Sequence, residues 1–164
     1  DSALKIVGCL KQILDGTDIK AYYTRLDDRD ISKRDRVRLA KDAGADVLIS
    51  VHCNASDAYD TTAKGVETLY SGRKKTTAGN LSSRQLAKDI LDEVCETTGR
   101  QRRKVIRRDQ LYLMHHADVP VTIVEVGYMT NRSDMRYLKK QKNQREIAQG
   151  IYNGLCKSLQ RIEK

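Results

Sequence analysis

Apolar residues recur along the chain with two different spacings, and stretches of the two kinds alternate. In residues 1–14 the apolar positions follow a helical period, which predicts an amphipathic helix that ends at Asp15-Gly16. In residues 46–52 they form a short continuous run, which is typical of a buried strand. The predicted helices are residues 1–14, 31–44, 82–99 and 143–162, and the predicted strands are residues 19–25, 46–52, 65–70 and 120–127.

Strands that alternate with helices, and that are apolar on both faces, predict a mostly parallel sheet covered by helices on both faces. The length of 164 residues fits one domain, and the single proline and the lack of repeats give no sign of an internal linker. We therefore predict an α/β fold, a single domain over residues 1–164 with a twisted, mostly parallel sheet. The chain opens inside a helix, whereas a βαβ unit opens with a strand, so we expect this sequence to begin late in its domain.

The charge of the chain suggests an anionic partner. Lys and Arg number 31 against 22 Asp and Glu, so the formal net charge is +9. Nucleic acid, an acidic polymer and a membrane surface all fit such a charge. The basic residues are spread over the chain with one dense run at residues 100–108, and both a solvated face and a functional one explain that run. With eight Tyr, no Phe, no Trp and no recognisable binding motif, we expect no nucleic-acid partner.

Neither the hydropathy nor the cysteines identify a compartment. No apolar run reaches transmembrane length, so we expect no transmembrane segment, and no signal peptide opens the chain. A mature secreted protein would also lack its signal. The four cysteines are widely spaced and form no CxxC pair, so we expect free buried thiols in place of a zinc ribbon or a disulfide scaffold.

Two predicted strands break their apolar pattern near the end at which α/β sheets bind ligands. His52 ends the strand at residues 46–52, and Glu125 lies near the end of the strand at residues 120–127. Each has an ordinary structural explanation when taken alone, since a strand-end histidine can be structural and the glutamate can be the first exposed residue. Taken together they predict a shared cleft on one rim of the sheet, with both side chains converging on it.

The residues around His52 and Glu125, and several segments elsewhere in the chain, form sequence motifs. Both the residues of these motifs and the order in which they occur are characteristic of one protein family. The motifs are YYTRLDD (22–28), RVRLAKDAGAD (36–46), GADVLISVHCNAS (44–56), GVETLY (65–70) and VEVGYMTN (124–131). In these motifs the chain resembles the catalytic domain of the zinc-dependent N-acetylmuramoyl-L-alanine amidases of bacterial autolysins, sporulation hydrolases and phage endolysins. The motifs cover nearly the whole chain in the family's order.

The resemblance implies a zinc-dependent hydrolase that cleaves the amide bond between N-acetylmuramic acid and L-alanine of peptidoglycan. It implies that His52 is a ligand of Zn²⁺ and that Glu125 is the catalytic carboxylate beside the metal, whereas the substrate-binding residues stay undetermined. It further implies a secreted monomer that acts in the cell wall or periplasm, with peptidoglycan and anionic wall polymers as partners. A catalytically inactive peptidoglycan-binding domain of the same fold is the alternative.

The chain also departs from the family pattern. The family's other two zinc ligands, a His and a Glu, would lie upstream of Asp1, so we expect an N-terminally truncated domain and do not assign His115 or His116 to the metal. Cys53 stands where the family has a small residue, and strand alternation predicts that it packs on the opposite face from His52. Residues 71–80 are too few for the helix that occludes some members, so we expect an open cleft.

Overall fold

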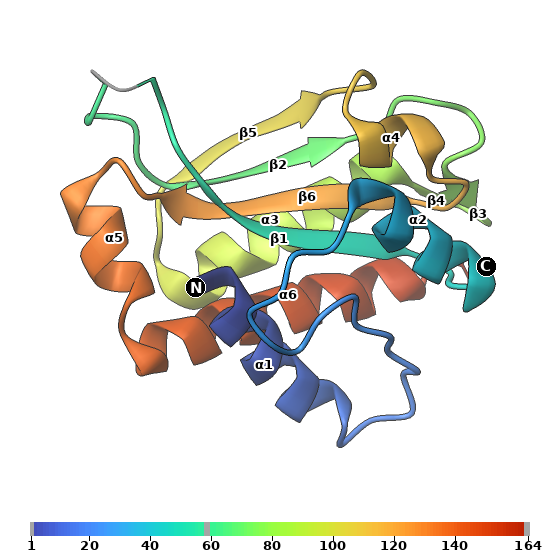
Figure 1. Cartoon of the computed structure of the whole chain (residues 1–164), viewed down its shortest axis with the longest axis horizontal. Helices are drawn as coiled ribbons and strands as arrows, with labels where there is room; N and C mark the ends of the chain where they lie inside the picture. Colours follow the sequence, from blue (N-terminus) through green and yellow to red (C-terminus); the bar gives the residue numbers. More distant parts are fainter. Residues whose placement is uncertain (1, 58–59, 163–164) are drawn as a thin grey trace.

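A four-stranded sheet forms the middle layer of the molecule (Figure 1). The computed structural model describes residues 2–57 and 60–162. The strands are β1 (Leu48–Asn54), β2 (Val66–Tyr70), β5 (Arg102–Arg107) and β6 (Val121–Tyr128), in the spatial order β1-β6-β2-β5. The pairs β1/β6 and β2/β5 are parallel and the central pair β2/β6 is antiparallel, which confirms the mostly parallel sheet of the predicted α/β fold.

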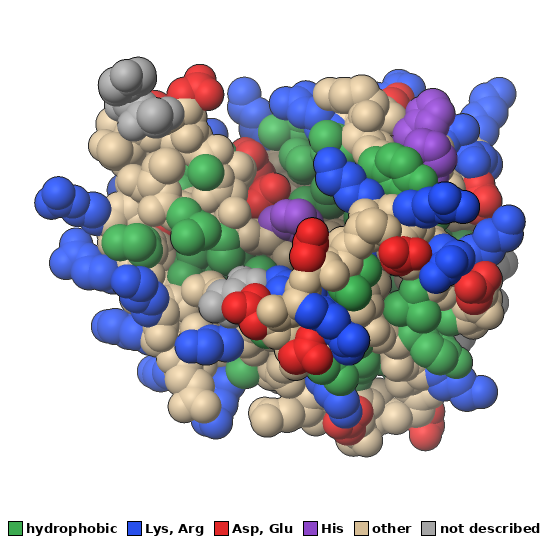
Figure 2. Space-filling model, viewed as in Figure 1, with side chains coloured by type: hydrophobic (Ala, Val, Ile, Leu, Met, Phe, Trp, Pro, Cys, Tyr) green, Lys and Arg blue, Asp and Glu red, His purple; other side chains and the backbone are tan. Residues whose placement is uncertain are grey.

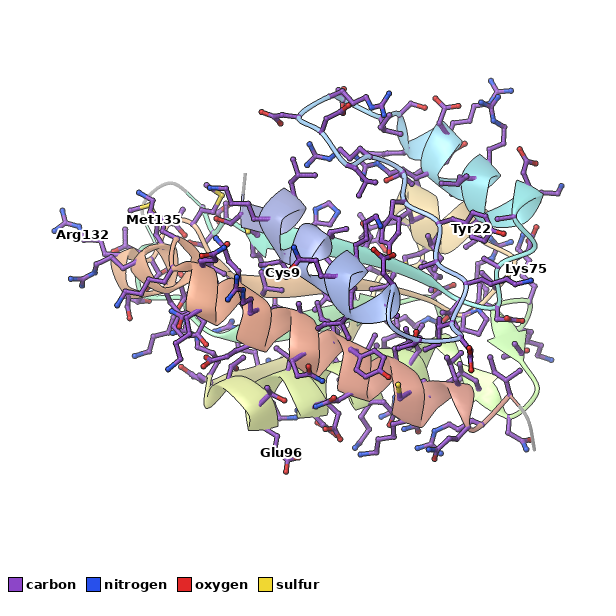
Figure 3. All side chains as sticks on the ribbon, turned by 90° about the horizontal axis from the view of Figure 1, so that it is seen from below. Cys9, Tyr22, Lys75, Glu96, Arg132 and Met135 are labelled. Carbon is purple, nitrogen blue, oxygen red and sulfur yellow. The ribbon has the colours of Figure 1, made fainter. Side chains whose placement is uncertain are left out.

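Helices cover both faces of this sheet, as the sequence predicted. They are α1 (Ser2–Leu14), α2 (Lys33–Asp42), α3 (Ser83–Thr98), α4 (Tyr112–His116), α5 (Arg132–Leu138) and α6 (Gln141–Leu159), and a short hairpin joins β3 (Thr77–Ala78) to β4 (Leu81–Ser82). Helices α1, α3 and α6 share one buried cluster with the sheet, in which α1 and α6 lie side by side (Figure 3), and α4 shares a second cluster with the other face. Over residues 2–57 and 60–162, no helix has the length and apolar character needed to cross a membrane.

Strand alternation decides which face each side chain of β1 occupies. Ile49, Val51 and Cys53 pack against the cluster of α1, α3 and α6, whereas Leu48 packs against the cluster of α4. Because successive side chains point to opposite faces, His52 lies on the face that α2 and α4 cover. The expected packing role of Cys53 is thereby confirmed, and all four cysteines are free and partly buried.

Helix α2 begins at Lys33, within the helix predicted over residues 31–44, and carries polar side chains to the site. Ser32 is its N-cap, and the Ser32 hydroxyl accepts a hydrogen bond from the Asp35 N–H at 3.0 Å. The chain leaves the helix through Gly44, whose φ of 59° is the left-handed conformation that glycine adopts without strain. This fixed start places Lys33 and Arg36, in the first turns of α2, above the end of β1.

The prediction of a strand at residues 19–25 is wrong, because this segment is irregular in the structure. A strand needs a neighbour about 4.8 Å away to pair with. Residues 22–25 instead face β1 across a groove of about 120 Å³ that Ile49 and Val51 also line. Within the described residues β1 therefore pairs with β6 alone and forms one edge of the sheet, and Tyr22 is 59% exposed on the loop beside it (Figure 3).

Strand β5 was not predicted as a strand. It lies within the basic run at residues 100–108, whose charged side chains conceal the strand pattern. It forms the other edge of the sheet, where charged side chains are common because they discourage pairing with a further chain.

The backbones of α3 and α6 approach each other at two buried glycines. A Cβ atom on Gly150 would lie 2.6 Å from the Val94 Cα, and one on Gly154 would lie 2.5 Å from the Ile90 Cα. Both distances are shorter than any ordinary contact with a Cβ atom. The two helices therefore pack backbone to backbone behind the sheet.

We expect Gly154→Ala to lower the free energy of unfolding by about 3 kcal/mol, because the added methyl group forces α3 and α6 apart. Gly8→Ala in α1 is the matched control, since a Cβ there meets nothing within 4 Å. That control should raise the free energy of unfolding by about 0.5–1 kcal/mol through helix propensity. Urea unfolding followed by circular dichroism measures both, and equal effects of the two substitutions would contradict the close packing.

Candidate functional site

His52 and Glu125 lie side by side on neighbouring parallel strands. Their Cα atoms are register partners in the β1/β6 ladder, and both side chains line one cleft on the face covered by α2 and α4. The expected convergence of the two residues on one rim of the sheet is therefore confirmed. Their chemical roles remain predictions.

The cleft has a volume of about 580 Å³ and is open to solvent. Strand side chains form its floor, namely Ser50, His52, Leu69, Ile123 and Glu125. One wall comes from residues 30–33 with Arg36, and the other from residues 111–113. The face drawn in Figure 2 is hollowed near its middle, where histidine and acidic side chains gather. Residues 71–80 form a turn and β3, in agreement with the open cleft that we expected.

His52 is exposed at the mouth of the cleft and forms part of its lining. Its Nε2 atom and the Ser50 hydroxyl lie 2.9 Å apart and share a hydrogen bond. Burial lowers the pKa of His52 below its usual value, and the positive charges of Arg36 and Arg25 lower it further. The site thus favours the neutral imidazole, which is the form that binds metals.

Glu125 is the most perturbed carboxyl group of the cleft. Its Oε2 atom is buried and has no hydrogen-bond partner among the described residues. Burial raises the pKa of Glu125 to about 7, and the negative charge of Glu67 adds to the effect. A carboxyl group whose pKa lies near neutrality can both accept and release a proton at that pH.

Glu67 is a buried residue of the site that the sequence reasoning did not assign. It is the register partner of Glu125 across the antiparallel β2/β6 pair and is 7% exposed. Its carboxylate accepts hydrogen bonds from the Asn54 side chain at 2.8 Å, the Tyr128 hydroxyl at 3.0 Å and the Arg103 Nε at 3.1 Å. The signal was present in the sequence, because Glu67 breaks the strand at residues 65–70 in the same way as Glu125 breaks its own strand.

The described residues do not complete a zinc site. A catalytic zinc typically takes three protein ligands, and the described part of the chain contains no group of three His, Cys, Asp or Glu side chains that could hold a metal ion. His52 offers one imidazole beside the unpartnered oxygen of Glu125. His115 and His116 lie on α4, outside the residues that line the cleft, and the His116 ring contacts both Tyr112 and His115.

A buried ionic cluster holds the strands around the site. Asp134, which is fully buried, accepts hydrogen bonds from the N–H groups of Gly65 and Tyr128, both at 2.9 Å, and forms an ion pair with Arg100. These contacts join the start of β2 to the end of β6. Since β2 and β6 carry Glu67 and Glu125, the cluster fixes the spacing of the two carboxyl groups.

Comparison with known proteins gives consistent results for sequence and structure. The sequence model of a family described as N-acetylmuramoyl-L-alanine amidase matches residues 1–157. The germination-specific N-acetylmuramoyl-L-alanine amidase of Bacillus subtilis is 30% identical over 135 residues, which are 82% of this chain and 53% of that protein. The amidase LytC of the same organism is 31% identical over 80% of this chain and 25% of its own length. The chain thus spans about half or less of these relatives.

The chain also resembles solved structures of N-acetylmuramoyl-L-alanine amidases. The N-acetylmuramoyl-L-alanine amidase of Clostridium difficile 630 is 29% identical, with a TM-score of 0.87 over 96% of this chain and 81% of its own. Amidase AmiC2 of Nostoc punctiforme is 26% identical, with a TM-score of 0.88 over 98% of this chain and 84% of its own.

We expect Glu125→Gln to make the metal-free protein more stable at high pH. Because its folded-state pKa is raised, Glu125 contributes stability that is fully present below its usual pKa of 4.5 and is lost as the pH rises through about 7. The linked change in unfolding free energy is on the order of 3 kcal/mol. Urea unfolding with a chelator should find little difference between variant and wild type at pH 4 and a more stable variant at pH 8. A difference that is independent of pH would refute the raised pKa.

Proposed function

The chain belongs to the family of N-acetylmuramoyl-L-alanine amidases, and we propose that it hydrolyses the amide bond between N-acetylmuramic acid and L-alanine of peptidoglycan. The observation that carries the proposal is the pairing of His52 with Glu125 in one open cleft. Its substrate lies outside the cytoplasm, so we infer a secreted protein of the cell wall or periplasm.

Glu125 acts as the general base and then as the general acid. The free Oε2 atom accepts a proton from the water that attacks the amide carbonyl, and the carboxyl group then passes this proton to the departing amine of L-alanine. In the metal-free protein the pKa of Glu125 is raised to about 7, so near neutral pH the group can both take up and release a proton. Burial of the carboxylate and the nearby charge of Glu67 supply this pKa.

His52 is a ligand of the zinc ion in this proposal. A zinc ion held by His52 and further ligands would supply Lewis-acid chemistry and an activated water beside Glu125. The described residues provide one of its ligands, so the others come from outside them. Within the chain, Ser50 orients the His52 ring through the hydrogen bond at Nε2, and the low pKa keeps the ring neutral.

A peptidoglycan-binding domain without activity is the second candidate. The observation in its favour is that the described residues contain no group of three metal-binding side chains. In that case the net charge of +9 would serve to bind anionic wall polymers. Hydrolysis of purified peptidoglycan by the full-length protein separates the two candidates, because a binding domain releases no stem peptide.

Glu125→Gln should lower the rate of peptidoglycan hydrolysis by about 10²–10⁴-fold, because the variant can no longer accept a proton. Its zinc content, measured by elemental analysis of the full-length protein, should stay close to that of the wild type. Glu96→Gln is the matched control, since Glu96 is exposed on α3 and projects away from the body of the molecule (Figure 3). Substantial turnover by Glu125→Gln would contradict the assigned role.

His52→Ala should lose bound zinc and activity together, because the variant lacks a metal ligand. His116→Ala, which removes an exposed histidine outside the cleft lining, should retain the zinc of the wild type. Elemental analysis after gel filtration measures both variants. If His52→Ala kept a full equivalent of zinc, His52 would not be a ligand.

A further inference from the structure

Three aromatic rings form a cluster on α4, beside the cleft, and two of them are stacked. The Tyr112 and His116 rings lie 3.9 Å apart between centroids and are nearly parallel, at 16°. His115 meets His116 edge-on at 4.9 Å. Tyr112 lines the cleft, whereas the two histidines are exposed. The metal-binding and proton-transfer roles described above use none of these three residues.

The stack is held in place at both its side chains and its backbone. Tyr112 and His116 are four residues apart and so share one side of the helix. The His116 Nδ1 atom lies 3.0 Å from the Tyr112 carbonyl oxygen, which fixes the imidazole against the phenol ring. Below them, Leu113 and Met114 are buried against the sheet, and the Ser71 hydroxyl donates a hydrogen bond to the Met114 carbonyl at 2.9 Å. A fixed aromatic surface therefore borders the cleft.

The two walls of the cleft differ in chemistry. The α2 wall carries Lys33 and Arg36 against the single carboxylate of Asp30, which leaves it positively charged. The α4 wall presents Tyr112 between Leu111 and Leu113 and carries no charge at these positions. Figure 2 accordingly shows histidine side chains next to hydrophobic ones on the rim of this face.

The substrate also has one charged half and one uncharged half, namely the stem peptide and the sugar. The stem peptide ends in a carboxylate, which suits the cationic α2 wall. The amide-linked sugar is neutral, and the C–H bonds on one face of a pyranose ring carry partial positive charge. That face packs favourably on the negative face of an aromatic ring.

We propose that Tyr112, supported by His116, is the surface on which the sugar of the substrate stacks, and that it selects glycan-linked peptides. The proposal rests on the amidase function proposed above. It also gives the substrate a direction in the cleft, with the glycan along α4, the peptide along α2, and the scissile amide over His52 and Glu125.

Two substrates with the same scissile amide test this surface in the full-length protein. One is a disaccharide pentapeptide, and the other is the same peptide with a D-lactoyl group in place of the sugars. Tyr112→Ala should lower kcat/KM on the disaccharide peptide about tenfold, mostly through KM, and leave the lactoyl peptide unchanged. Tyr112→Phe should behave as the wild type, and His116→Ala should show a smaller loss confined to the disaccharide peptide.

Tyr22→Ala is the matched control, because Tyr22 is exposed and lies outside the lining of the cleft. An equal loss on both substrates, or no loss on the disaccharide peptide, would overturn the proposal. The dissociation constants of both peptides, measured on Glu125→Gln and on Glu125→Gln with Tyr112→Ala, test the surface without catalysis. If the wild type cleaves neither substrate, the amidase function fails, and these constants still decide the role of Tyr112.

Discussion

The register of the β1/β6 pair is the constraint on which the site depends. In this register His52 stands beside Glu125, and strand alternation sends both side chains to the face covered by α2 and α4. A slip of one residue would turn His52 toward α3 and bring Cys53 into the cleft. The buried side chain of Val124, which packs on the opposite face, holds the register because moving it would expose apolar surface.

The two carboxyl groups of the site, those of Glu67 and Glu125, lie close together on one sheet but have different surroundings. Glu67 is satisfied by three donors that come from β1, β5 and β6, so its charge is stabilised and its position is fixed. Glu125 faces it across the β2/β6 pair without such donors for Oε2. The difference in hydrogen bonding separates a carboxylate with a full set of donors from one with an unpartnered oxygen, and the second is the one that we propose as the general base.

The sequence allowed α1, α2, α3 and α6, three strands and the meeting of His52 with Glu125 to be predicted, because each rests on local periodicity or on strand ends. The short helices α4 and α5 were not predicted, because so few turns show no clear period. The strand predicted at residues 19–25 is absent, since the sequence of a segment does not reveal whether another strand lies close enough to pair with it. The antiparallel β2/β6 pair and the donors around Glu67 join segments far apart in the chain, which no local pattern encodes. Strand β5 was hidden by basic residues, of which Arg103 turns out to neutralise Glu67.

The two outer strands of the sheet bear on how the protein behaves when it is concentrated. An unpaired strand edge is a template onto which a second molecule can add its own strand. Strand β5 counters this with exposed cations such as Lys104, whose mutual repulsion keeps two copies apart. Strand β1 has few charges, and the loop at residues 22–25 lies across the groove in front of it. Among the described residues this loop is the segment that covers the β1 edge, so we expect that cutting or shortening it would expose the edge and favour aggregation through β1.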